Sequence, residues 1–219
     1  DIINLLFYLQ RAVIAFCGNH NANGFKSGQH TKENDMILSA SRRTDIPRYY
    51  LDWLLNRLRE GYALVRNPMN HRQISRVPLT HDVLDCIAFW SKNPAPMLPR
   101  LKELEPYSYY VQFTITPYGK DIESNLPDKD ELIGTFQSLS AAIGPERVVW
   151  RYSPVLLSDT YTLDCHLRRF QEFAGRLRGY TTSCRLRFLD IYRTIPQRMV
   201  KLGVRHLHAP DQISLAHPF

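Results

Sequence analysis

The sequence predicts an α/β fold in which about six β-strands, mostly parallel, alternate with helices. From residue 36 onward, stretches rich in β-forming residues alternate with stretches whose apolar residues recur at helical spacing. The helical stretches are long enough to cross between parallel strands. Neither G-x-G-x-x-G nor G-x-x-x-x-G-K-[ST] occurs, which disfavours a nucleotide-binding sheet. We therefore predict a partial TIM-like (β/α) barrel. A complete barrel has eight units, so the pattern also predicts truncation at the C-terminus.

Three segments differ in composition and predict the domain organisation. Residues 1–35 combine an apolar segment, Ile2 to Cys17, with a Gly-, Asn- and His-rich stretch that has no periodicity. The apolar segment is shorter than the ~20 residues that a membrane span needs. We predict that 1–35 is an extension, that 36–203 is the barrel domain, and that 204–219 is an irregular tail. The alternative for the N-terminal segment is a short helix that packs on the domain or lies on a membrane surface.

The first half of the domain contains three predicted strands and one helix. MILSAS at 36–41 predicts the first strand, and RYYLDWLLNRLREG at 48–61 predicts a helix that ends at Gly61. Helical spacing places Tyr50 and Trp53 of this helix in the core. YALVRNP at 62–68 predicts the second strand, QISRVPL at 73–79 a short extended piece, and DCIAFWSKNP at 85–94 the third strand.

The second half continues the alternation. Asn93-Pro94 predicts the start of a helix over 95–104, and SYYVQFTITP at 108–117 predicts the fourth strand. A helix over 128–144 precedes the fifth strand, RVVWRYSPV at 147–155. A helix over 162–179 precedes the sixth strand, TSCRLRFLDIY at 182–192. RTIPQRMVKLG at 193–203 predicts a broken helix, because Pro196 interrupts it.

Polar and charged residues follow almost every predicted strand. Functional residues of an α/β barrel lie at the carboxyl ends of its strands, so these side chains are the candidate site. Convergent cations would bind a phosphate, a carboxylate or a nucleic-acid backbone. Structural roles compete: Asp45 and Asn93 also fit helix caps, and Asp190 fits a structural ion pair. The predicted site residues are Arg43, Asp45, Arg66, Asn67, Lys92, Asn93, Arg151 and Asp190.

Charge and cysteine content limit the classes of partner and site that the chain could have. The chain has 21 Arg and 7 Lys and a formal net charge of +7, which favours an acidic partner, either an anionic small molecule or nucleic acid. A basic surface with no specific partner is the alternative. The four scattered cysteines contain no C-x-x-C, which argues against a metal or cofactor site in this chain and is typical of a cytoplasmic protein. G-x-S-x-G is absent, so no catalytic residue is assigned.

Seven stretches between about Met36 and Gly203 form a specific set of motifs: MILSASRRTDIP, REGYALVRNPMN, QISRVPL, CIAFWSKNPAPML, YYVQFTITPYG, VVWRYSPV and FLDIY. Together they resemble a bacterial family, domain-of-unknown-function family 1848. The resemblance implies a radical-SAM-like barrel. It also implies that full-length members use S-adenosylmethionine and a [4Fe–4S] cluster held by C-terminal cysteines. This chain has no cysteine cluster, so it is not expected to assemble the iron–sulfur cluster alone.

Three hypotheses follow. In the first, the chain is the substrate-binding, anion-binding part of a radical-SAM-like protein, and whether it acts as an enzyme is left open. In the second, it is a non-catalytic protein that binds nucleic acid or another polyanion. In the third, it is a degenerate gene fragment that self-associates through the open edges of its barrel.

Overall fold

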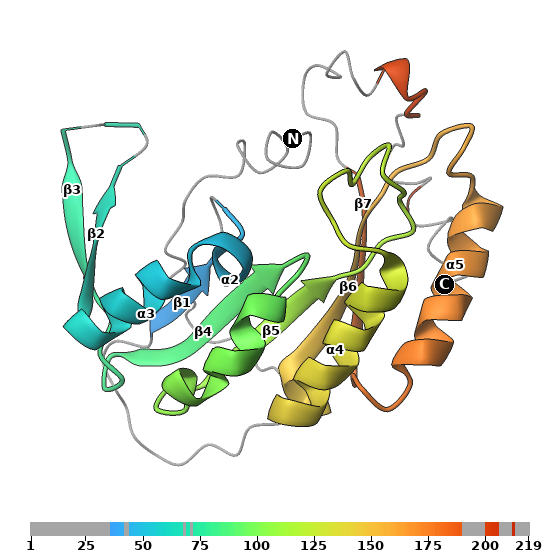
Figure 1. Cartoon of the computed structure of the whole chain (residues 1–219). Helices are drawn as coiled ribbons and strands as arrows, with labels where there is room; N and C mark the ends of the chain where they lie inside the picture. The colour runs from blue at the N-terminus through green and yellow to red at the C-terminus, as the bar shows by residue number, and fades with distance from the viewer. Residues whose placement is uncertain are drawn as a thin grey trace.

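The main sheet has five parallel strands. The computed structural model describes residues 36–41, 44–67, 69–70, 72–189, 200–205 and 212. The sheet order is β1-β4-β5-β6-β7, and each neighbouring pair is parallel (Figure 1). The predicted α/β class and mostly parallel sheet are therefore confirmed. Over the described residues the sheet is open and does not close into a barrel. Its strands are β1 (Met36–Ala40), β4 (Leu84–Ser91), β5 (Tyr109–Thr114), β6 (Val148–Val155) and β7 (Cys184–Phe188).

The helices pack on one face of this sheet. Phe136 of α4 stacks on Phe113 of β5 with ring centroids 5.3 Å apart, and Phe170 of α5 stacks on Trp150 of β6 at 4.8 Å. These contacts belong to one apolar core between sheet and helices. The helices are α2 (Ile46–Tyr49), α3 (Leu51–Glu60), the 3₁₀ helix η1 (Ala95–Leu104), α4 (Lys129–Ile143), the short 3₁₀ turn η2 (Pro145–Arg147) and α5 (Leu163–Leu177).

The prediction that Tyr50 and Trp53 lie in the core is wrong. Their side chains are 51% and 46% exposed. The predicted single helix is broken at Tyr50, whose φ of −134° and ψ of 23° separate α2 from α3. The break changes the direction in which residues before and after it point. The buried side chains of α3 are consequently Leu51, Leu54, Leu55 and Leu58.

Residues 62–68 were predicted as a strand of the main sheet, and this is also wrong. Strand β2 (Tyr62–Arg66) pairs with β3 (Ile74–Pro78) in a separate antiparallel hairpin. The backbone bond from Asn67 N to Gln73 O closes the loop between them. A connection this short allows an antiparallel hairpin, whereas a parallel pair needs a crossover of about a dozen residues. The hairpin projects from the body beyond α3 (Figure 1).

Other predictions fall partly outside the described residues. The N-terminal extension 1–35 and most of the predicted broken helix and tail lie there, although Val200 and Lys201 are helical. Within the described part of the chain, no helix combines the length and apolar character needed to cross a bilayer.

Candidate functional site

Asp45 connects two strand ends at the carboxyl edge of the sheet. Its Oδ1 accepts a hydrogen bond from the Arg48 backbone N–H at 3.1 Å, which confirms the predicted helix cap. Its Oδ2 accepts from the Ser91 hydroxyl at 2.9 Å and from the Lys92 N–H at 3.0 Å. Burial raises the pKa of Asp45, although these hydrogen bonds oppose the rise. The carboxylate therefore fixes the residues after β1 against the end of β4.

Replacing Asp45 by Ala should lower the free energy of unfolding by about 2 kcal/mol. The substitution removes the cap of α2 and leaves the Ser91 hydroxyl and the Lys92 N–H without this acceptor. Urea denaturation measures the change. Asp128→Ala is the matched control, because Asp128 precedes α4 but makes no side-chain capping bond. Equal losses in the two variants would contradict the role assigned to Asp45.

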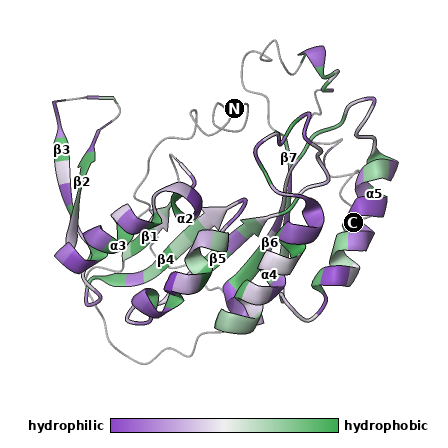
Figure 2. Ribbon diagram, in the orientation of Figure 1, coloured by the Kyte–Doolittle hydropathy of each residue, from purple (hydrophilic) through white to green (hydrophobic). Residues whose placement is uncertain are grey.

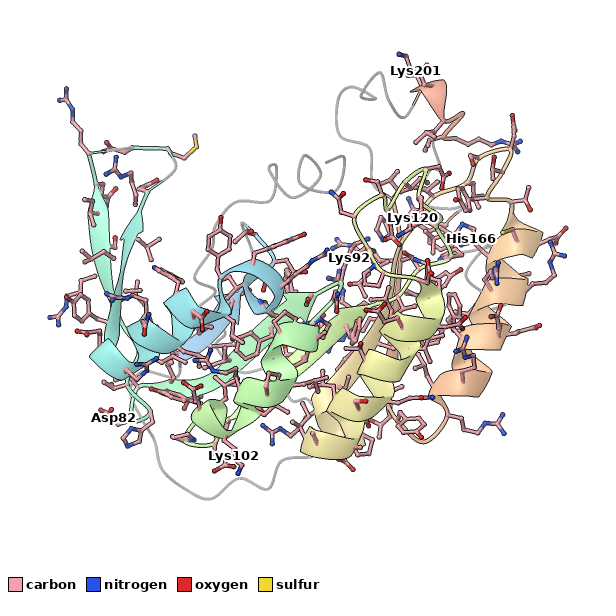
Figure 3. All side chains as sticks on the ribbon, in the orientation of Figure 1. Asp82, Lys92, Lys102, Lys120, His166 and Lys201 are labelled. Carbon is pink, nitrogen blue, oxygen red and sulfur yellow. The ribbon has the colours of Figure 1, made fainter. Side chains whose placement is uncertain are left out.

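A buried ion triad lies beside this junction. Glu123, in the loop between β5 and α4, forms ion pairs with Lys92 through Oε1 and with Lys129 through Oε2, the latter at 2.6 Å. The Thr116 hydroxyl also donates to Glu123 Oε1 at 2.9 Å. The Glu123 side chain is only 2% exposed. Figure 3 shows Lys92 where the arrows of β4 and β5 end.

The charges of the triad stabilise one another. Burial alone would raise the pKa of Glu123, but the positive charges of Lys92 and Lys129 hold it below its usual value, so Glu123 is ionised. Burial lowers the pKa of Lys92, and Glu123 opposes this change. The two ammonium groups of Lys92 and Lys129 share the one carboxylate of Glu123.

Arg151 of β6 is the centre of a second cationic group. Its guanidinium lies over the Trp90 ring, 5.2 Å from the ring centroid. Burial lowers the pKa of Arg151, and the positive charges of Arg187 and Arg185 lower it further. Arg151 pairs in register with Thr114 of β5 and Arg185 of β7, so these three side chains share a sheet face. That face is opposite the one on which Phe113 and Trp150 contact the helices.

The structure brings together three of the predicted site residues and separates two others. Asp45 bonds the Lys92 backbone, and Arg151 is close enough to lower the pKa of Lys92. Arg66 and Asn67 lie instead on the projecting hairpin, where the Asn67 amide donates to Gln73 Oε1 at 2.8 Å.

Pro94 is the N-cap of η1 and the helix has no side-chain capping bond, so the predicted cap is wrong, but Asn93 does have a structural role. Its Oδ1 accepts from the Ala95 N–H at 3.2 Å at the start of η1. Its own N–H donates to the Ser91 hydroxyl at 3.0 Å. The remaining two predicted residues, Arg43 and Asp190, lie outside the described residues.

Sequence reasoning missed Glu123, Lys129 and Arg185. Glu123 and Lys129 lie beyond the end of β5, in a loop and at the first residue of α4, so no strand-end rule selects them. Arg185 lies between Cys184 and Leu186 on β7, and this alternation does not show which face of the sheet the arginine takes. A search for acidic residues near the loops that follow each strand would have found Glu123.

The described cysteines do not form a cluster site. Cys86, Cys165 and Cys184 lie on β4, α5 and β7. Among the residues with a described position, no group of three or more His, Cys, Asp or Glu side chains could hold a metal ion. The described residues therefore do not fit a [4Fe–4S] cluster, which needs converging thiolates.

A family model described as "Domain of unknown function (DUF1848)" matches residues 37–219. Neither a curated protein nor a solved structure matches the chain.

Proposed function

The chain belongs to the family of the domain of unknown function DUF1848, and from this premise we propose that it binds an anionic substrate through Arg151 at the carboxyl edge of its sheet. The substrate class is a small molecule that carries a phosphate or a carboxylate. Arg185 and Arg187 supply further positive charge, and the Asp45 junction and the Glu123 triad form a rigid wall beside them.

The observation that carries this proposal is the grouping of three guanidinium groups. No ion pair joins Arg151, Arg185 or Arg187 to a carboxylate anywhere in the described part of the chain. Burial is the largest cause of the lowered pKa of Arg151, and the positive charges of Arg187 and Arg185 add to it. Holding like charges together costs free energy unless an anion binds between them. A guanidinium donates two parallel hydrogen bonds to phosphate or carboxylate oxygens, which suits this class of ligand.

Lys92 and Lys129 have a different role. Both ammonium groups are already paired with Glu123. They therefore hold the Glu123 triad in place and attract the anion at long range, but they do not contact it directly. Trp90 lies beneath Arg151 and limits the directions in which its guanidinium points. Such support by neighbouring groups lowers the entropic cost of binding.

The strand order supports the finer expectation of a partial barrel. The order β1-β4-β5-β6-β7 follows the chain sequence, as successive strands of a (β/α) barrel do. We therefore propose that the sheet is an open part of a radical-SAM-like barrel and holds the substrate. Any [4Fe–4S] cluster and S-adenosylmethionine would be supplied outside the described residues, and no chemical step is assigned to them here.

Calorimetric titration with pyrophosphate and with malonate tests the proposal. Arg151→Gln should weaken binding of the preferred anion roughly 10- to 100-fold. The control Arg168→Gln removes an exposed arginine of α5 and should leave the affinity unchanged. The melting temperature of the ligand-free Arg151→Gln protein should not fall, because the substitution relieves repulsion among the arginines. Unchanged affinity, or a large loss of stability in that variant, would refute the binding role.

A further inference from the structure

A second surface, formed by α2, α3 and the hairpin, combines exposed aromatic rings with exposed arginines. Tyr49, Tyr50 and Trp53 are 59%, 51% and 46% exposed, whereas aromatic side chains of this size usually bury most of their area. They lie on α2, at its end and on α3. The hairpin β2–β3 follows α3 directly and lies with it at one end of the molecule, and α2 precedes α3 (Figure 1). We call this the aromatic–arginine surface, comprising Tyr49, Tyr50, Trp53, Arg72 and Arg76 with the exposed tip residue Met69.

The hairpin is positively charged along its length. Residues 61–81 contain Arg66, Arg72 and Arg76 and no Asp or Glu. The Arg76 guanidinium lies 4.3 Å from the centroid of the Tyr62 ring, and the Arg48 guanidinium lies 4.9 Å from that of Tyr49. The arginines and aromatic rings are thus interleaved. A surface of this composition attracts a polyanion.

Hydrogen bonds of Asn67 order the described residues of the hairpin tip, among which Met69 is exposed. Asn67 bonds Gln73 through both backbone and side chain, and its Oδ1 accepts from the Met69 N–H at 2.9 Å. These bonds hold Met69 outward, with 90% of its side chain exposed. Figure 2 shows hydrophobic and hydrophilic residues side by side on the hairpin. A hairpin that bound its partner through charge alone would not need exposed apolar residues. The partner therefore also presents apolar faces.

We propose that this surface binds single-stranded nucleic acid. Unpaired bases stack on exposed aromatic rings, while arginines contact the phosphates, and this pairing of contacts is the common basis of single-strand binding. In a duplex the base faces are covered by their neighbours, so Tyr49, Tyr50 and Trp53 could not stack on them. A second copy of this chain fits poorly, because each copy carries a net charge of +7 and the hairpin has no acidic residue.

Fluorescence anisotropy with a labelled oligothymidine of about 12 nucleotides tests the proposal. The wild-type protein should bind this strand more tightly than the corresponding duplex, with an affinity that falls steeply as salt rises. Trp53→Ala should weaken binding roughly tenfold or more. Arg72→Gln with Arg76→Gln should reduce the slope of log affinity against log salt by up to about 1.4.

Two controls separate this surface from general charge and from the Arg151 site. Arg168→Gln with Arg178→Gln removes the same charge from an exposed position of α5 and from the exposed residue that follows this helix, and should have little effect. Arg151→Gln should leave oligothymidine affinity unchanged even where it abolishes binding of pyrophosphate or malonate. The proposal is overturned if the duplex binds more tightly, if Trp53→Ala has no effect, if the α5 pair weakens binding as much as the hairpin pair, or if no strand binds at low salt.

Discussion

Replacing Glu123 by Gln should lower the free energy of unfolding by about 3–5 kcal/mol. The substitution keeps the size of the side chain but removes the only negative charge of the triad. Lys92 and Lys129, whose side chains are 15% and 23% exposed, would then repel each other in a poorly solvated position. For a chain of this length the melting temperature should fall by roughly 10 °C, which calorimetry measures.

A double-mutant cycle shows whether the loss comes from charge pairing. Lys92→Met combined with Glu123→Leu should cost less than the sum of the two single changes, because each single change breaks the Lys92–Glu123 ion pair and leaves one of its two charges in a poorly solvated position. Glu103→Gln is the control, since Glu103 pairs with Arg100 at the exposed surface, where ion pairs contribute little. If the two substitutions changed the free energy of unfolding additively, charge pairing between Lys92 and Glu123 would be contradicted.

The direction of the pH dependence follows from the lowered pKa of Glu123. Its folded-state pKa lies below the ordinary value of 4.5, so its contribution to stability is complete above that pH. The contribution is lost as pH falls through the lower folded-state value. In the Glu123→Gln variant this part of the acid destabilisation should be absent.

The arrangement of the main sheet was predictable because its strands are buried. Apolar runs such as Ile87–Phe89 and Val148–Trp150 are flanked by helices with one apolar face, and burial makes that pattern regular. Ala63-Leu64-Val65 gives the same apolar signal, yet Leu64 and Val65 are exposed on the hairpin. A short apolar run does not reveal whether another element packs on it, and for this reason residues 62–66 were misplaced.

The candidate site was predictable where it depends on strand ends. Asp45 and Lys92 follow the neighbouring strands β1 and β4, and Arg151 lies within β6, in register with the last residue of β5. Parallel strands bring their carboxyl ends together. Glu123 was not predictable in this way. It reaches Lys92 because the loop after β5 folds back over the end of β4, and loop conformation depends on tertiary contacts such as the bond from Arg48 to the Asn125 carbonyl.

Protonation of His166 should make the protein unfold progressively as pH falls below about 6.5. The ring is fully buried between β6 and α5. Its Nε2 lies 2.9 Å from the Leu156 carbonyl oxygen, which can only accept, so Nε2 carries the proton. Nδ1 then accepts from the Tyr152 hydroxyl at 2.9 Å. Burial lowers the pKa of His166 below its usual 6.5, which keeps the imidazole neutral in the folded state.

The sign of this effect is fixed by the lowered pKa. Below pH 6.5 the unfolded chain binds a proton at this residue that the folded chain does not, so stability falls by about 1.4 kcal/mol per pH unit until the folded-state pKa is reached. His166→Gln should remove this part of the pH dependence, because a glutamine amide can still donate to the Leu156 carbonyl but does not titrate.

Urea denaturation from pH 8 to pH 5 gives the free energy of unfolding for both proteins. The exposed His81→Gln variant should retain the wild-type profile. Parallel profiles for wild type and His166→Gln would show that another group controls acid unfolding. A steeper loss in wild type would show that a neutral imidazole between Tyr152 and Leu156 maintains the packing of α5 against β6.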